Sequence, residues 1–583
     1  MKGSAIGVCL GLILAIHVGV LAWGARAQSP TIDEIAYLPA GLSHWQLGNF
    51  ELANVSPPLI RTIAATPLLV VGAETNWREL LTHLPGARIS HAVGSDFVQA
   101  NGPRSLWLFT LARWALIPLS VLGAVCCYLW ARDLSGPGAG LCSACLWCFC
   151  PNVLAHAQLV TADAGATALC VAAAYMFWRW LKSPTWVQAL LAGIALGLAE
   201  SAKTTLLVLV VLWPLLWLAW NWPTRRSTSR TQWKRGAAQI GLILVLAWYV
   251  LNLAYAFDGS FKRLDRFVFV SRTFTGDLKA GAIGNRFTKS WLGAIPVPFP
   301  EQYVLGIDSQ KRDLENVDPT YRGGPYRSYL RGEWSNRGWW YYYLYAMAVK
   351  VPLGTWLVIA VAICWRPRAA VAGLANWRDD LVLLAPLVTI LAFVSSQTGF
   401  SMHFRYVLPI LPFAFIWISQ SVRATLPRSL TRNLAIAAGL AWSIASSLWA
   451  APHHLSYFNE LAGGPFGGHF HLTESNIDWG QDLLYLEKWI DAHPEALPMH
   501  VAYLGLFPPK LARIDFPPPV GSPASGSGIP AAPELRPGWY AISIGYVQGN
   551  PYGGERHLEY FQKLKPTAFA GYSIYLYYIP TAG

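Results

Sequence analysis

The sequence predicts a polytopic α-helical membrane protein with a small soluble α/β domain at its C-terminal end. The chain has 583 residues, of which 54% are hydrophobic and only 13% are charged, and its mean hydropathy is positive. The apolar residues come in long blocks rather than in amphipathic stripes. A block of roughly 17 to 25 residues can cross a hydrocarbon core of about 30 Å as a helix, so these blocks predict membrane helices.

About eleven such blocks follow one another along the chain. They cover residues 5–23, 106–130, 139–154, 165–181, 187–198, 205–220, 238–255, 340–365, 381–395, 406–418 and 434–449. The first block could be a signal peptide. Cleavage after Ala25 or Ala27 would separate it from the acidic residues that follow, so we favour an uncleaved helix.

Positive charges set the orientation that we predict. The short connections between blocks carry Lys and Arg on one common side when the helices are counted, which makes that side cytoplasmic. The long polar segments 24–105, 257–339 and 451–583 are then extracytoplasmic. We therefore predict a multi-pass protein of the plasma (inner) membrane, with a membrane domain at 1–450 and an extracytoplasmic domain at 451–583. The net charge of +13 reflects these connections, so nucleic acid is not an expected partner.

The nine cysteines lie in or at the edges of the apolar blocks, which leaves none for disulfides in the polar segments. Cys142, Cys145, Cys148 and Cys150 have spacings that resemble a metal site. No His or basic residue lies near them in the sequence to stabilise thiolates. We therefore interpret them as small apolar packing residues.

The C-terminal tail combines helix-like and strand-like stretches. Residues 481–492 have a helical pattern, and residues 499–504, 539–547 and 573–579 alternate as strands do. Residues 516–538 have the composition of a disordered insert. These features predict a small α/β domain.

The motif from Asp478 to Asp482 precedes the predicted tail helix. We expect Asp478 to be the N-cap of that helix, with Gln481 in the reciprocal capping position. Trp479 is expected to pack against the membrane domain. The alternative is a second catalytic centre.

The stretch from Thr31 to Tyr37 places two adjacent carboxylates, Asp33 and Glu34, just beyond the first apolar block. An acidic pair held over a membrane surface is a candidate active site. The alternative is that Asp33 or Glu34 caps the helix that begins there, because carboxylates are favourable in a first helical turn. Residues Ser56 to Leu59 then form a rigid Pro-Pro corner that leads back to the bilayer.

Two more polar features recur on the same predicted side, where an ionisable group is costly unless it has a use or a partner. The stretch from Asn152 to Asp163 leads into a helix, and Thr161 or Asp163 has the alternative role of its N-cap. The tight turn from Glu200 to Lys203 joins two apolar helices. A stray interfacial lysine is one interpretation of Lys203, but phosphate binding fits its placement better.

The last feature is the stretch from Gly399 to Pro409, which holds His403, Arg405 and Tyr406 at the outer mouth of a helix. A guanidinium there can bind a phosphate bidentately. The alternative is an interfacial anchor, with Arg405 snorkelling and Tyr406 in the aromatic belt. Together the features place two acids and two cations at one water–lipid boundary, which suits transfer of a group from a lipid phosphate.

The order of these motifs resembles the protein O-mannosyltransferase-like group of type C glycosyltransferases, which includes the lipid A aminoarabinose transferases. The resemblance spans residues 1–450 and rests on Asp33-Glu34, Ser56-Pro57-Pro58-Leu59, Thr161-Ala162-Asp163, Lys203 and Arg405-Tyr406-Val407-Leu408-Pro409. Three further motifs resemble bacterial members with an exported C-terminal domain: Gly338-Trp339-Trp340-Tyr341-Tyr342, Tyr457-Phe458-Asn459-Glu460 and the stretch from Ser475 to Asp482. The family often has His or Lys directly before the Pro-Pro-Leu turn, where this chain has Ser56.

The resemblance implies a polyprenyl-phosphate-linked sugar donor, used on the outer face to modify a hydroxyl of a protein, lipid or glycan acceptor. It makes Asp33 the leading candidate for the base, beside Glu34 as a second catalytic candidate. The candidates for substrate binding are Asp163, Lys203, His403, Arg405 and Tyr406. The resemblance implies no certain cofactor. A divalent cation is optional, because carboxylates alone bind such ions weakly, and its candidate ligands are Asp33, Glu34 and Asp163.

Two other classes of function fit part of the pattern. A transporter or flippase for a lipid-linked anion also needs cations and acids near a bilayer boundary, but a carrier places them near the midplane on broken helices. A structural scaffold for envelope assembly would explain the tail but not the acidic pair. The outer-loop position of the polar residues therefore favours the glycosyltransferase.

Overall fold

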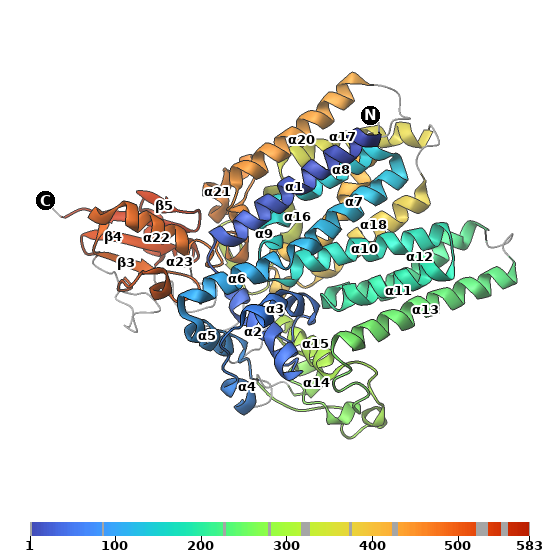
Figure 1. The fold of residues 1–583 in the computed structure, drawn as a ribbon, viewed down its shortest axis with the longest axis horizontal. Helices are drawn as coiled ribbons and strands as arrows, with labels where there is room; N and C mark the ends of the chain where they lie inside the picture. Colours follow the sequence, from blue (N-terminus) through green and yellow to red (C-terminus); the bar gives the residue numbers. More distant parts are fainter. Residues whose placement is uncertain are drawn as a thin grey trace.

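The computed structural model describes residues 3–83, 87–224, 229–277, 281–315, 327–371, 376–422, 429–519, 535–549 and 558–581. A bundle of long helices forms most of the molecule, and a small sheet domain projects from one end of it (Figure 1). The predicted fold class, a polytopic helical protein with a C-terminal α/β domain, is confirmed. Most of the predicted disordered insert lies outside the described residues.

Each of the eleven predicted membrane blocks contains helix. In the described part, seven helical stretches are long and apolar enough to cross a membrane, and two bent pairs raise this number to nine. Leu59–Val71 and Trp186–Glu200 are shorter apolar helices. The helices of the bundle are α1 Gly3–Ala27, α6 Ser105–Trp114, α7 Ile117–Ser135, α8 Pro137–Cys148, α9 Pro151–Ala157, α10 Ala162–Lys182, α11 Trp186–Glu200, α12 Val208–Asn221, α13 Arg230–Ala254, α16 Tyr342–Lys350, α17 Leu353–Val371, α18 Trp377–Ser396, α19 Leu411–Ser419 and α20 Leu430–Ala450.

Two of the predicted blocks are bent rather than straight. The axes of α8 and α9 differ by 59°, and those of α16 and α17 by 109°. Pro151 begins α9 and Pro352 directly precedes α17. Proline has no backbone N–H to continue a helix and clashes with the preceding turn, so each helix breaks where a proline stands.

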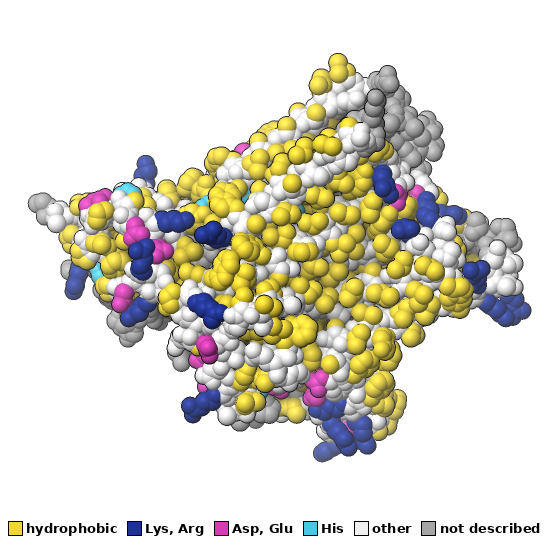
Figure 2. Space-filling model, in the orientation of Figure 1, with side chains coloured by type: hydrophobic (Ala, Val, Ile, Leu, Met, Phe, Trp, Pro, Cys, Tyr) yellow, Lys and Arg dark blue, Asp and Glu magenta, His cyan; other side chains and the backbone are white. Residues whose placement is uncertain are grey.

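The outward face of the bundle is apolar. Figure 2 shows hydrophobic side chains over the broad central surface, with Lys and Arg gathered towards its margins. Val187, Val211, Leu215 and Val245 are each more than half exposed. Such a surface is unusual in a soluble protein but is the surface that lipid requires.

The two long loops, one after α1 and one after α13, are folded and pack together. The first holds α2 Ile32–Leu47, α3 Leu59–Val71, α4 Arg78–Thr82 and α5 Ser90–Asn101. The second holds α14 Arg272–Thr275, α15 Glu301–Leu314 and the hairpin β1 Ser328–Leu330 with β2 Glu333–Ser335. Gly306 of α15 lies so close to the first loop that a Cβ there would come within 2.1 Å of the Asn54 carbonyl oxygen.

The C-terminal domain is a four-stranded sheet with α22 Leu483–Ala492 beside it. Its strands, β3 Met499–Ala502, β4 Gly538–Ser543, β5 Ala568–Ala570 and β6 Ile574–Ile579, lie in the order β3-β4-β6-β5. Only the β3–β4 pair is parallel. The predicted strands 499–504 and 573–579 are confirmed, whereas 539–547 is a strand that ends in a helical turn, α23 Ile544–Val547.

The expected capping role of Asp478 is wrong. The N-cap of α22 is Asp482, with no side-chain capping bond. Asp478 instead accepts hydrogen bonds from the backbone N–H of Gly480 (3.3 Å) and of Gly545 (3.2 Å). Its carboxylate therefore ties the loop before α22 to α23.

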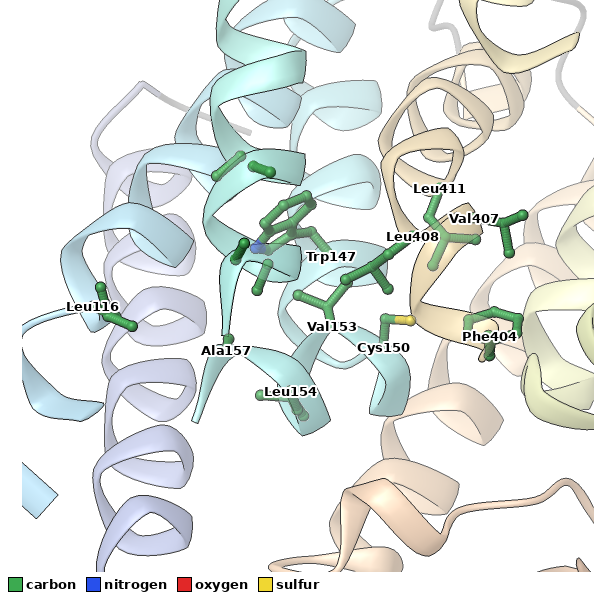
Figure 3. Packing of buried hydrophobic residues seen from close by; sticks show 14 of the residues in the cluster. Leu116, Trp147, Cys150, Val153, Leu154, Ala157, Phe404, Val407, Leu408 and Leu411 are labelled. Atoms are coloured by element: carbon green, nitrogen blue, oxygen red, sulfur yellow. The ribbon is translucent and has the colours of Figure 1, made fainter. Parts of the chain in front are cut away.

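The core next to the candidate site lies between the α8–α9 bend and the segment η7, Phe404–Ile410. Figure 3 shows Cys150, Val153 and Leu154 on one side of this core, with Phe404 and Leu408 on the other. All nine cysteines are free, and seven of them are buried. Cys150 thus serves as the packing residue that the sequence predicts, and the bend fixes the helical turn that carries Arg405.

Candidate active site

Asp33 and Glu34 stand together in the first turn of α2 but have different surroundings. Thr31 is the N-cap, and Glu34 closes a capping box: its Oε2 accepts bonds from the Thr31 backbone N–H (2.9 Å) and hydroxyl (3.0 Å). The capping alternative therefore describes Glu34. The Asp33 carboxylate lines a cavity and accepts a bond from Arg405.

Glu34 is fully buried, and its carboxylate accepts hydrogen bonds from Thr31, Arg113 and Val160. Arg113 of α6 binds it with two N–H groups, at 2.8 and 2.6 Å, and the Val160 N–H donates to it at 2.7 Å. The sequence analysis missed Arg113. The signal was present, because a lone arginine within an apolar block needs a buried partner.

Asp163 and Lys203 form a second acid–base pair. Asp163 lies in the first turn of α10, and Lys203 follows α11 in the turn that starts η2 Thr204–Leu207. Lys203 Nζ donates to Asp163 Oδ1 at 2.6 Å. The Lys203 ammonium also lies 5.4 Å from the centre of the Tyr406 ring, a cation–π distance.

Arg405 joins the two pairs. Its Nη1 lies 2.9 Å from Asp33 Oδ2 and 3.8 Å from Asp163 Oδ2. The guanidinium stacks on Trp479 of the tail, with its central carbon 4.2 Å from the ring centre. Trp479 thus packs against the membrane domain, as the sequence predicts, and it does so on a residue of the candidate site.

The four charges form one cluster, the quartet Asp33, Asp163, Lys203 and Arg405. Two carboxylates face two cations, so the quartet is neutral as a whole. Its members come from four segments that lie far apart in the sequence. Among the described residues Arg405 Nε has no hydrogen-bond partner, so one buried N–H donor at the centre of the quartet is unsatisfied.

The quartet opens onto a cavity of about 1110 Å³. Its walls come from both long loops, from α18, and from the tail. Val394, Phe400 and Tyr343 contribute apolar surface, while Tyr37, His91 and Gln310 contribute polar groups. A cavity of this volume lies just above the upper end of the range of roughly 300–1,000 Å³ that is usual for small-molecule sites.

The tail positions the turn that precedes Arg405. Ser475 Oγ and His403 Nδ1 lie 2.8 Å apart. Asn476 accepts a bond from the Phe404 N–H at 2.9 Å and donates to the Met402 carbonyl at 2.7 Å. Burial, together with the nearby Arg405 charge, holds the pKa of His403 well below its usual range, so this imidazole is neutral.

Glu474 is a cavity residue that the sequence analysis did not single out. It is buried, lines the cavity beside Trp479, and has φ of 60°. Within the part of the chain that the structure describes, its Oε1 has no hydrogen-bond partner. Nothing in the local sequence marks this burial, because it arises only when the tail folds back onto the bundle.

The three candidate metal ligands do not form a common ligand set. Asp33 is paired with Arg405, Glu34 with Arg113 and Asp163 with Lys203. Within the described residues, no group of three or more His, Cys, Asp or Glu side chains is arranged to hold a metal ion. The three carboxylates therefore offer no shared position for a divalent cation in this arrangement.

Comparisons with known proteins bear on the bundle. Residues 109–250 match the family model described as dolichyl-phosphate-mannose-protein mannosyltransferase. This segment contains Asp163 and Lys203, and the match confirms the predicted family resemblance there. No curated protein matches the chain.

The solved structures that resemble this chain at low sequence identity include the following three. ArnT from Cupriavidus metallidurans in the apo state is 14% identical, with a TM-score of 0.46 over 98% of each chain. The Archaeoglobus fulgidus oligosaccharyltransferase in the apo form is 12% identical, with a TM-score of 0.44 over 97% of this chain and 73% of that one. The S. cerevisiae protein O-mannosyltransferase Pmt1-Pmt2 complex is 16% identical, with a TM-score of 0.34 over 44% of this chain and 34% of that one.

Proposed function

We propose, from the family matched by residues 109–250, that this chain is a membrane glycosyltransferase. In this proposal it moves a sugar from a polyprenyl-phosphate donor to an acceptor hydroxyl on the extracytoplasmic face. The observation that carries the proposal is the quartet at the cavity, which supplies two cations for a phosphate and one accessible carboxylate for a proton. The acceptor is a protein, lipid or glycan hydroxyl.

The two cations suit the donor phosphate. Lys203 supplies a compact charge and Arg405 a planar fork, which are the two common ways of binding a phosphate. In the structure these charges are paired with Asp163 and Asp33. A bound phosphate would compete with the two carboxylates for these cations.

This competition gives Asp33 its role as base. While Arg405 holds it, the Asp33 carboxylate is occupied by an ion pair. When the phosphate draws Arg405 away, a carboxylate oxygen of Asp33 becomes free to accept a proton while the donor is in place. It then takes the proton of the acceptor hydroxyl as that oxygen attacks the sugar.

The remaining candidates have supporting roles in this proposal. Asp163 orients Lys203, and Tyr406 lies under both cations. His403 fixes the turn before Arg405 through Ser475. Glu34 acts indirectly, because its bonds to Thr31 and Arg113 hold the turn that carries Asp33.

The proposed function is tested by measuring sugar transfer with purified protein. Wild-type protein in detergent is incubated with radiolabelled polyprenyl-phosphate sugars and membrane extract, and we expect label in an acceptor. Asp33→Asn should still bind donor yet transfer little, because an amide cannot accept the proton. Asp96→Asn on α5, which alters a carboxylate bonded to Asn76, is the matched control and should transfer normally. Near-normal turnover by Asp33→Asn at saturating donor and acceptor would refute the base assignment.

A further inference from the structure

The carboxyl of Glu474 is paired with no cation of the described residues at the candidate site. Glu474 is only 4% exposed, and its Oε1 is buried with no hydrogen-bond partner in the same described part. The charged groups that act on it are Arg405, Asp33 and Asp478, and its own charge acts on Tyr342. Arg405 is the only cation among them.

The charge of Arg405 is already balanced by other carboxylates. It pairs with Asp33 at 2.9 Å and lies 3.8 Å from Asp163, and Lys203 is bonded to Asp163. Two cations therefore serve two carboxylates. A third ionised carboxylate in this volume would be buried and uncompensated, which is the arrangement that proteins avoid by keeping the group protonated.

The backbone supports a functional reason for this placement. Glu474 has φ of 60°, in the left-handed region that side chains other than Asn, Asp and Gly seldom adopt. Its carbonyl accepts bonds from the N–H groups of Ile477 and Asp478, both at 2.9 Å. These bonds hold the residue in the strained turn, and strained residues of this kind gather at functional sites.

We propose that Glu474 works as a neutral carboxylic acid whose O–H donates a hydrogen bond to the phosphate of the donor, while Asp33 works ionised. The inference rests on the proposed function and adds a residue to it. Two carboxyl groups in one site whose surroundings favour opposite protonation states are a recurrent way to obtain an acid and a base at one pH. Burial raises the pKa of Glu474 to about 8, which agrees with this assignment.

In the proposed sugar transfer, the acceptor hydroxyl gives its proton to Asp33. The acceptor oxygen forms the new bond to the anomeric carbon. The bond from that carbon to the phosphate oxygen breaks, and the electron pair stays on the phosphate. The charge that develops there is met by Lys203, by Arg405 and by the O–H of Glu474, which keeps its proton.

The decisive substitution is Glu474→Gln, because glutamine keeps an N–H donor but does not titrate. Wild-type transfer should fall as pH rises through about 8, where Glu474 loses its proton. Glu474→Gln should keep most of the activity at neutral pH and lose this alkaline decline. Glu474→Gly suits the positive φ and removes the donor, so it should fold and lose on the order of 10²-fold in rate.

Two controls separate this inference from the proposed function. Glu495→Gln, an exposed carboxylate of the same domain, should leave the pH profile unchanged. Difference infrared spectra between neutral and alkaline pH should show a protonated carboxyl band in substrate-free wild-type protein that Glu474→Gln lacks. If wild-type protein transfers no sugar, the proposed function fails while the infrared band still reports on Glu474.

Two results would overturn the inference itself. Glu474→Gln as inactive as Glu474→Gly at every pH would mean that the carboxylate works ionised. A wild-type alkaline decline that persists in an active Glu474→Gln protein would assign the titration to another group.

Discussion

In the function that we propose, Lys203 and Arg405 serve both folding and chemistry. Each is buried and ion-paired with an acid of the quartet, and each lines the cavity that we propose as the donor site. Removing one partner of a buried pair usually costs about 3–5 kcal/mol, because it leaves a charge uncompensated. A loss of activity alone would therefore not identify the donor site.

We predict that Lys203→Ala weakens donor use by on the order of 10²-fold and also lowers stability, because Asp163 loses its bond at 2.6 Å. The double variant Asp163→Asn/Lys203→Met removes both charges and should recover much of the stability without recovering donor use. Thermal unfolding in detergent and the rate at limiting donor are the two measurements. Recovery of both by the double variant would make Lys203 a structural residue only.

For the Glu34–Arg113 pair we expect a structural role rather than a direct role in transfer. Both side chains are almost completely buried, so Glu34→Gln leaves the Arg113 charge without its partner and should destabilise the protein by roughly 3–5 kcal/mol. Arg132→Ala breaks a surface pair with Asp133 and should change stability by no more than about 1 kcal/mol. A stable but inactive Glu34→Gln protein, judged by denaturant unfolding and transfer assays, would instead give Glu34 a direct catalytic role.

At the scale of elements, the orientation of Asp33 depends on how closely α5 packs against α2. A Cβ at Gly94 of α5 would come within 2.1 Å of the carbonyl oxygen of Ile35, two residues after Asp33. We predict that Gly94→Ala pushes the helices apart, costs about 1–3 kcal/mol and reduces transfer. Gly241→Ala on α13, where a Cβ meets nothing within 4 Å, is the control and should be neutral or slightly stabilising. Wild-type unfolding temperature and activity in Gly94→Ala would contradict the prediction.

Elements were easier to predict from sequence than the contacts between them. The blocks next to Asp33, Asp163, Lys203 and Arg405 are apolar and long, so the position of each residue near a helix end follows from hydropathy alone. The pairing of Asp33 with Arg405, which are 372 residues apart, depends on the tertiary fold and has no local signal. The same is true of Glu474, whose burial depends on the tail folding back.

The Asp478 prediction failed for a related reason. A capping motif specifies a hydrogen bond to the next turn, but it does not specify that the helix begins there. The first residue of α22 is Leu483, and tertiary bonds to Gly545 and Gly480 occupy the Asp478 carboxylate instead. Local patterns in this tail were overridden by its contacts.

At the scale of the whole molecule, the start of α2 and the tail meet at the candidate site. The Ser29 N–H donates to the Gln481 carbonyl at 3.0 Å, and the Ile32 N–H donates to the Trp479 carbonyl at 3.1 Å. In Figure 1 the C-terminal domain lies at one end of the bundle, and the end of α12 and the start of α13 lie at the other. The site is therefore on the side of the molecule that carries the C-terminal domain.

This arrangement yields a topological prediction, with the C-terminal domain outside and the α12–α13 connection in the cytoplasm. Cysteines introduced as Glu495→Cys and Thr231→Cys place exposed thiols at the two ends of the bundle. In intact cells an impermeant thiol reagent should label Glu495→Cys and spare Thr231→Cys, and lysis should expose both. The seven buried native cysteines should react little, and the parent protein corrects for Cys9 and Cys364. The reverse pattern would place the quartet on the cytoplasmic side and exclude a donor presented on the outer face.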